Sequence, residues 1–108
     1  MTSLTEREKA FEAKYEHDQE IAFKVHVRQI KLFGLWAAGR MGLSKDEANA
    51  YAKKLIDSDI EKRGGDALHI VLKDLTAKGL SLSEHQVRRE FDRLLPLAKS
   101  EVMAETGH

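Results

Sequence analysis

Residues that interrupt helices are scarce in this chain and gather in short stretches. There is one proline, and six of the seven glycines fall at residues 34–42, 64–65 and 79. Between these stretches, apolar residues recur at the three- and four-residue spacing of an amphipathic helix. No segment alternates for long with the period of two that a β-strand requires. The pattern predicts an all-α fold, a small four-helix bundle with a flexible or extended-helical N-terminal segment.

Capping signals set the expected boundaries of the helices. A serine or threonine followed three residues later by Glu or Gln is typical of a helix start, and glycine is typical of a helix end. Two identical triplets, Gly42-Leu43-Ser44 and Gly79-Leu80-Ser81, predict the same helix-entry chemistry twice. The expected helices begin near Thr5 (with Glu8) and end at 39–42, begin at Ser44 (with Glu47) and end at 64–65, run from Asp66 to Lys78, and open at Ser81 (with Glu84) or Ser83 (with Gln86).

Two expectations concern the packing of these helices. In the first helix, Val25, Leu32 and Trp36 share a face that Gln29 and Phe33 flank, and we expect Trp36 in the core because its ring area is large. In the last helix, Pro96 lies within the apolar stripe. Since proline lacks the amide for a helical hydrogen bond, it should kink or split that helix.

The charges are balanced overall but unevenly distributed. Lys plus Arg and Asp plus Glu each number 18, so the chain has no basic excess of the kind that nucleic-acid binding or lipid attraction uses. Residues 1–20 hold three basic and six acidic residues, whereas residues 21–40 hold four basic residues and no acid. We therefore expect an N-terminal segment at 1–20, a helical bundle at 21–104 and a frayed tail at 105–108.

Signals for chemistry are weak throughout. The chain has no cysteine, and its five histidines lack the i, i+4 spacing of a helical metal pair. No nucleotide-binding or nucleophile motif is present, so we expect no enzyme activity. No apolar run is long enough for membrane insertion, and no signal-peptide core precedes the acidic start, so we expect a cytoplasmic protein.

The N-terminal segment is the strongest anomaly. Its glutamates recur at i, i+4, which weakens an isolated helix by a few tenths of a kcal/mol per pair, and its larger apolar residues are Leu4, Phe11 and Tyr15. Such a segment lacks the apolar area to hold itself firmly on a bundle, yet it has the residues to fold into a groove of a partner. The alternative is a helical extension without a role.

Three stretches carry a resemblance to a known family: Arg7 to Tyr15, Leu32 to Ser44, and Ala50 to Lys53. Their ordered combination resembles the zeta subunit family of α-proteobacterial F-type ATP synthases, over essentially the whole chain. The resemblance implies a regulatory inhibitor of ATP hydrolysis, peripheral to the inner membrane when bound to the synthase. The N-terminal segment would insert at an α/β catalytic interface of F1, next to the γ rotor stalk, and the bundle would position it.

Carried onto this sequence, the resemblance gives a set of candidate partner-binding residues. They are Leu4, Phe11 and Tyr15 as apolar contacts and Arg7, Glu8, Lys9, Glu12 and Lys14 as polar contacts. We expect a monomer when free and no resident cofactor, with weak ATP or ADP binding left open. Two rivals also stay open: a helical DNA-binding or adaptor module that uses Arg88, Arg89 and Arg93 of the fourth helix, and a nucleotide-binding bundle.

Overall fold

The computed structural model describes the backbone of residues 2–62 and 66–106 and the side chains of residues 18–62 and 66–106. Over these residues the fold consists of four packed helices and contains no strand, which confirms the expected all-α class. The helices are α1 (Thr2–Arg40), α2 (Lys45–Glu61), α3 (Ala67–Ala77) and α4 (Glu84–Thr106).

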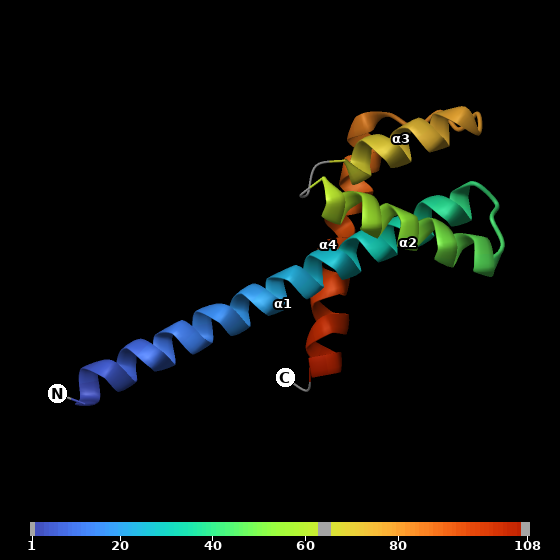
Figure 1. Cartoon of the computed structure of the whole chain (residues 1–108). Coiled ribbons are helices and arrows are strands. Elements are labelled where there is room, and N and C mark those ends of the chain that lie inside the picture. Colours follow the sequence, from blue (N-terminus) through green and yellow to red (C-terminus); the bar gives the residue numbers. More distant parts are fainter. Residues whose placement is uncertain (1, 63–65, 107–108) are drawn as a thin grey trace.

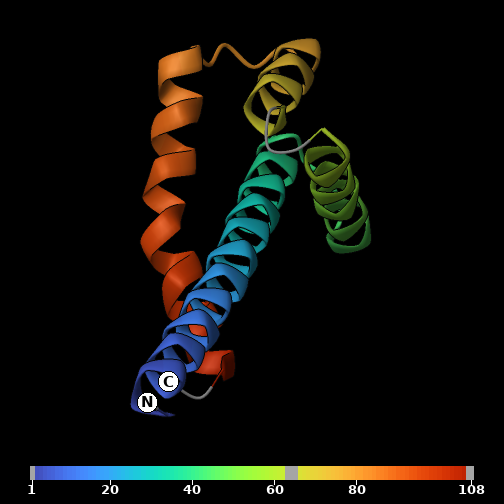
Figure 2. The ribbon, with the colours of Figure 1, turned by 60° about the vertical axis from the view of Figure 1, so that its left-hand side comes forward.

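The long helix α1 is the axis on which the molecule is built. It has 39 residues, which corresponds to a length of about 58 Å, and the molecule measures 66 × 25 × 22 Å along its principal axes. Both α2 and α4 pack against the second half of α1, and α3 lies at the end of the bundle (Figures 1 and 2). The first half of α1 extends beyond the other helices.

Two glycines end helices as the sequence predicts. Gly42 (φ 75°) and Gly79 (φ 80°) adopt the left-handed conformation that L-residues avoid. The amide of Leu43 then donates to the carbonyl of Ala38 and the amide of Leu80 to that of Leu75, each at 3.0 Å. These bonds satisfy carbonyls that the end of a helix leaves free, so the two Gly-Leu pairs perform the same chemistry.

The serines of the two identical triplets do not share one role. Ser44 caps α2 as expected, because its Oγ accepts a hydrogen bond from the Glu47 amide at 3.2 Å. Ser81 does not cap α4. Ser83 does, since the Gln86 amide donates to Ser83 Oγ at 3.1 Å and the Ser83 amide donates to Gln86 Oε1 at 2.9 Å. That reciprocal pair is the second of the two expected starts.

Two other expected boundaries need adjustment. The backbone of α1 is already helical at Thr2, so the expected start near Thr5 is three residues late. Pro96 does not split α4, which continues from Glu84 to Thr106. Pro96, and Asp92 whose carbonyl loses its helical partner at the proline, are both exposed residues of α4.

The face of α1 that is buried in the core is not centred on the line of Val25, Leu32 and Trp36 that the sequence predicts. Phe33 is fully buried, and its ring meets that of Phe91 edge to face at 5.0 Å between centroids. Gln29 is also buried, whereas Leu32 and Trp36 are only partly so. The face is displaced because α1 packs on α2 as well as on α4. Trp36 stacks on Phe33 at the border of the core.

Helices α1 and α2 are in close contact at Gly34. A methyl group on Gly34 would lie 2.9 Å from the Cα of Ala52 and 3.2 Å from its Cβ. Because the 2.9 Å contact is with a backbone atom and is shorter than real Cβ contacts, a side chain at residue 34 would force the two backbones apart. Gly34 thus allows α1 and α2 to pack closely beside the buried Leu55.

Gly34→Ala should therefore destabilise the protein although alanine favours helices. We expect the free energy of unfolding to fall by roughly 1–2 kcal/mol, because the strain of overpacking exceeds the gain in helix propensity. Gly39→Ala is the matched control, since a methyl group there meets nothing within 4 Å and should raise stability by about 0.5 kcal/mol. Urea unfolding of both variants measures this, and equal stabilisation by the two would contradict the packing argument.

Candidate functional site

The predicted partner-binding residues all belong to the projecting half of α1. Their backbone is helical and lies beyond the ends of α2 and α4 (Figure 1). Their side chains lie outside the described residues, so the contact roles given to them remain predictions. The eight positions are Leu4, Arg7, Glu8, Lys9, Phe11, Glu12, Lys14 and Tyr15.

The helical register relates this segment to the core. Positions 18 residues apart lie on the same side of an α-helix, because they are separated by about five full turns. Phe11 is in this way in register with Gln29, and Tyr15 with Phe33. Both Gln29 and Phe33 are buried in the bundle. The face of α1 that forms the core is therefore the face on which the projecting half carries its aromatic positions.

On the α4 side, ionic and apolar contacts hold α1 where it leaves the bundle. Arg28 Nη1 lies 2.8 Å from Glu101 Oε1, and Arg28 Nη2 pairs with Glu105 one turn further along α4. The hydrogen bond to Glu105, which has the larger effect, and the hydrogen bond to Glu101 raise the pKa of the Arg28 guanidinium. Beside them, Val25 packs in a small apolar cluster with Val102 and Ala98.

On the α2 side, a polar contact crosses to α1 at nearly the same level. His26 Nε2 lies 2.8 Å from Asp59 Oδ2, and the side chain of Asp59 is only 6% exposed. One turn further in, Gln29 Nε2 donates to the carbonyl of Phe91 on α4 at 2.9 Å. Helix α1 is thus held from two sides at residues 25–29, next to the point where its projecting half begins.

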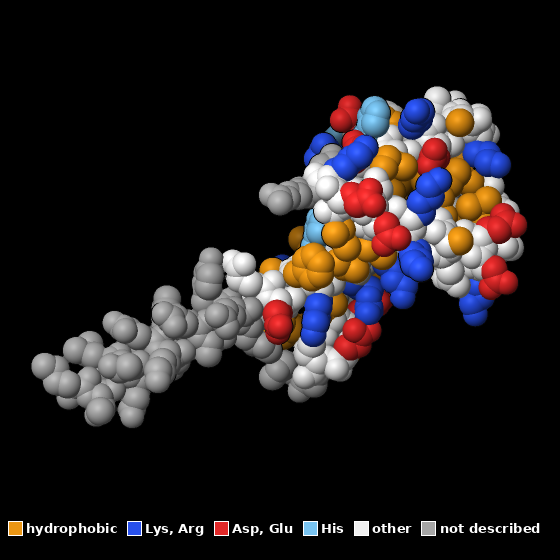
Figure 3. Space-filling view, viewed as in Figure 1, with side chains coloured by type: hydrophobic (Ala, Val, Ile, Leu, Met, Phe, Trp, Pro, Cys, Tyr) orange, Lys and Arg blue, Asp and Glu red, His pale blue; other side chains and the backbone are white. Residues whose placement is uncertain are grey.

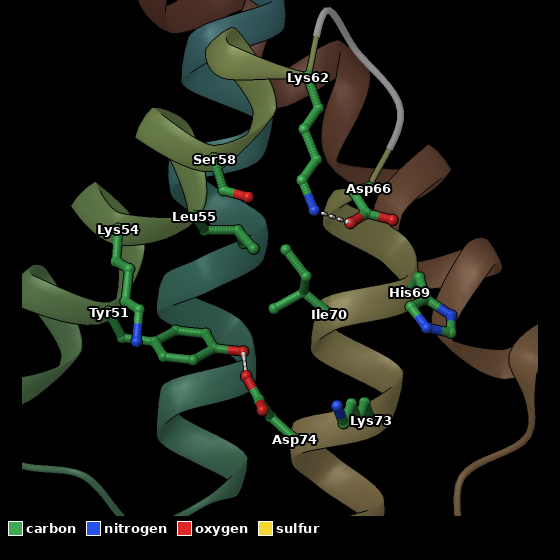
Figure 4. Close-up of a pocket in the computed structure, with 10 residues that line it drawn as sticks. All are labelled: Tyr51, Lys54, Leu55, Ser58, Lys62, Asp66, His69, Ile70, Lys73 and Asp74. Carbon is green, nitrogen blue, oxygen red and sulfur yellow. Dashed lines mark hydrogen bonds and ion pairs between the residues drawn. The ribbon is translucent and has the colours of Figure 1, made fainter.

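A second candidate site is a cleft of about 380 Å³ between α2 and α3. Figure 4 shows polar side chains from both helices around it. The hydroxyl of Tyr51 donates to Asp74 Oδ2 at 2.8 Å, and Lys62 Nζ lies 3.0 Å from Asp66 Oδ2. The other lining residues are Lys54, Leu55, Ser58, His69, Ile70 and Lys73.

The lining of this cleft suits binding better than catalysis. Burial has the largest effect on the pKa of Tyr51, and the hydrogen bond to Asp74 adds to it. Together they raise this pKa well above its usual range, so the phenol stays a neutral donor. Among the described side chains, no group of three His, Cys, Asp or Glu could hold a metal ion. Lysine ammonium groups can bind phosphate, but the weak binding of ATP or ADP that the sequence left open stays open. Sequence reasoning missed the cleft, because Tyr51 reads as one member of an apolar stripe and Asp74 is distant in the chain.

The raised pKa of Tyr51 has a consequence at alkaline pH. The folded protein keeps the phenolic proton at pH values where the unfolded chain has lost it. The stability that this hydrogen bond adds, about 1 kcal/mol, is therefore present below about pH 10 and is lost above it. Urea unfolding of wild type and Tyr51→Phe should show a difference at about pH 8 that shrinks by about pH 11. A difference that stays constant over this range would contradict the assignment.

The arginines of α4 offer little free positive charge for DNA. Arg93 pairs with Glu90, which lies one turn earlier on the same helix. The guanidinium in turn lowers the pKa of Glu90. Arg88 and Arg89 are exposed, with Asp92 also exposed nearby. This face is a mixed, partly paired surface of the kind expected for solvent contact.

The fold and the site together define a class of protein. Within the described residues it is an all-helical protein without a group of three His, Cys, Asp or Glu side chains that could hold a metal ion, and its longest helix projects beyond the bundle. Residues 1–101 match the family described as ATPase inhibitor subunit zeta. The chain belongs to this family.

A solved structure supports the fold. A protein whose structure was determined in solution by NMR is 42% identical to this chain, with a TM-score of 0.66. The alignment covers 77% of this chain and 95% of that one. No curated protein matches.

Membership of the family fixes the general role. The chain is a regulatory subunit and not an enzyme, and the family implies inhibition of F1FO-ATP synthase through binding to the F1-ATPase. Among the described residues, no helix has the length and apolar character to cross a membrane. Because the family is one of inhibitors of the F1-ATPase, the DNA-binding interpretation of α4 is set aside.

Proposed function

We propose that this chain inhibits ATP hydrolysis by inserting its N-terminal segment, residues 1–20, at an α/β catalytic interface of F1 next to the γ rotor stalk. The observation that carries the proposal is the continuity of α1, whose second half is packed into the bundle while its first half extends beyond it. A segment placed in this way can enter a partner while the bundle stays folded outside.

The contacts at residues 25–29 support a positioning role for the bundle. Arg28 is bonded to α4 and His26 to α2, so the direction in which α1 leaves the bundle is fixed from two sides. A helix that is held at its base loses less freedom on binding than an unattached peptide, and this lowers the cost of association. The free protein acts as a monomer, and its place of action is the cytoplasmic side of the inner membrane.

The helical register supports the choice of contact residues. Phe11 and Tyr15 are in register with residues that α1 buries in the bundle. The same face of α1 would therefore be buried by the bundle along its second half and by F1 along its first half. Burial of two aromatic side chains is a typical source of binding energy at an interface. The flanking Arg7, Glu8, Lys9, Glu12 and Lys14 would make the polar contacts, and Leu4 would add apolar area near the tip.

Phe11→Ala combined with Tyr15→Ala tests these roles. We expect the concentration needed for half-inhibition of purified F1 hydrolysis to rise by about tenfold or more, because truncation of interface aromatics typically costs over 1 kcal/mol each. The melting temperature should change little, since the backbone at both positions belongs to the half of α1 that projects beyond α2 and α4. A large drop in melting temperature would make them core residues, and unchanged inhibition would remove them from the interface.

A further inference from the structure

Two large apolar side chains are exposed near the point where α1 leaves the bundle. Phe23 on α1 is 56% exposed and Ile60 on α2 is 50% exposed, more than any other large hydrophobic residue among the described side chains. The contact between His26 and Asp59, at 2.8 Å, brings these parts of the two helices together. Phe23 lies one turn before His26, and Ile60 directly follows Asp59.

These residues belong to a larger apolar surface. Val27 and Ile56 are partly exposed and lie one helical turn further into the bundle than Phe23 and Ile60, respectively. Residues four apart lie on the same side of a helix, so each helix contributes a pair. We call the four residues the exit patch. Figure 3 shows hydrophobic side chains over the seam between α1 and α2, with basic side chains beside them.

Exposed lysines give the α1 side of the exit patch a basic character. Lys24 and Lys31 are exposed and neighbour Val27 on α1, and Lys53 is exposed one turn before Ile56. The exposed acids near the exit patch are Glu20 on α1 and Asp57 and Glu61 on α2. Arg28, the other basic residue in this part of α1, is already paired with α4. A matching partner surface is therefore apolar at its centre and carries carboxylates opposite Lys24 and Lys31.

We propose that the exit patch is a second contact surface for the F1 partner, on an apolar area with an acidic rim next to the site that receives the N-terminal segment. This inference rests on the proposed function. Its main support is continuity, because Phe23 follows Tyr15 on the same helix by eight residues, or about 12 Å. A partner that encloses the helix as far as Tyr15 ends close to the exit patch.

A second contact of this kind determines how long the inhibitor stays bound. The N-terminal segment reaches its site in either case, so saturating amounts of protein should give full inhibition with or without the exit patch. Loss of apolar contacts acts mainly on the dissociation rate, and loss of the surrounding charges acts mainly on the association rate. Binding kinetics therefore separate the exit patch from the N-terminal segment.

The test uses the full-length chain, purified F1 and the double variant Phe23→Ala/Ile60→Ala. We expect the dissociation rate to rise by about tenfold, with maximal inhibition retained and the melting temperature close to that of wild type. The matched control is Leu97→Ala, which truncates a 47%-exposed leucine on α4 and should stay within about twofold of wild type. Lys24→Glu/Lys31→Glu should slow association and reduce its dependence on salt.

Each other outcome counts against the inference in a distinct way. If wild type does not inhibit F1, both the proposed function and the role of the exit patch are contradicted. If wild type inhibits and the double variant dissociates at the wild-type rate, the role of the exit patch is contradicted and the proposed function is not. Self-association of the free wild type in sedimentation velocity, abolished by the double variant, would assign the exit patch to a second copy of the chain and overturn the proposal.

Discussion

The packing of the second half of α1 between α2 and α4 is the interaction on which the rest of the molecule depends. Gly34 permits the approach to α2, and Phe33 and Gln29 meet Phe91 of α4 by ring contact and hydrogen bond. An isolated helix with a ladder of like charges is marginal in water. A helix that is already nucleated in the bundle can extend from residue 21 toward the N-terminus without a new nucleation step, so packing of one half supports the other.

The same constraint separates the two tasks of the chain. The bundle provides stability through apolar residues contributed by all four helices, and we propose that the aromatic positions of the projecting half of α1 contact a partner. Arg28 and His26 lie at the boundary and fix the direction of α1 through contacts with different helices. Neither task needs a catalytic group, which agrees with membership of a family of regulatory inhibitors.

Local sequence signals predicted much of the fold, and long-range packing accounts for what they missed. The ends of helices at Gly42 and Gly79 and the cap at Ser44 follow from side chains within a few residues, so they were predictable. The choice of Ser83 over Ser81 was not, because both positions carry a suitable partner three residues on. The burial of Gln29 and the pairing of Tyr51 with Asp74 join residues far apart in sequence, and periodicity gives no information on such pairs. For the candidate site, the sequence indicated the segment, whereas its register with the core required the continuous helix of the structure.

The central claim is that the N-terminal segment inhibits and the bundle positions it. The most direct measurement is the ATP hydrolysis rate of purified α-proteobacterial F1 with the full chain and with a variant that lacks residues 1–18, whose folding is checked by circular dichroism and thermal melting. We expect strong inhibition by the full chain, none by the truncated chain, and a bundle that still unfolds cooperatively. Equal inhibition by the folded truncated chain would contradict it.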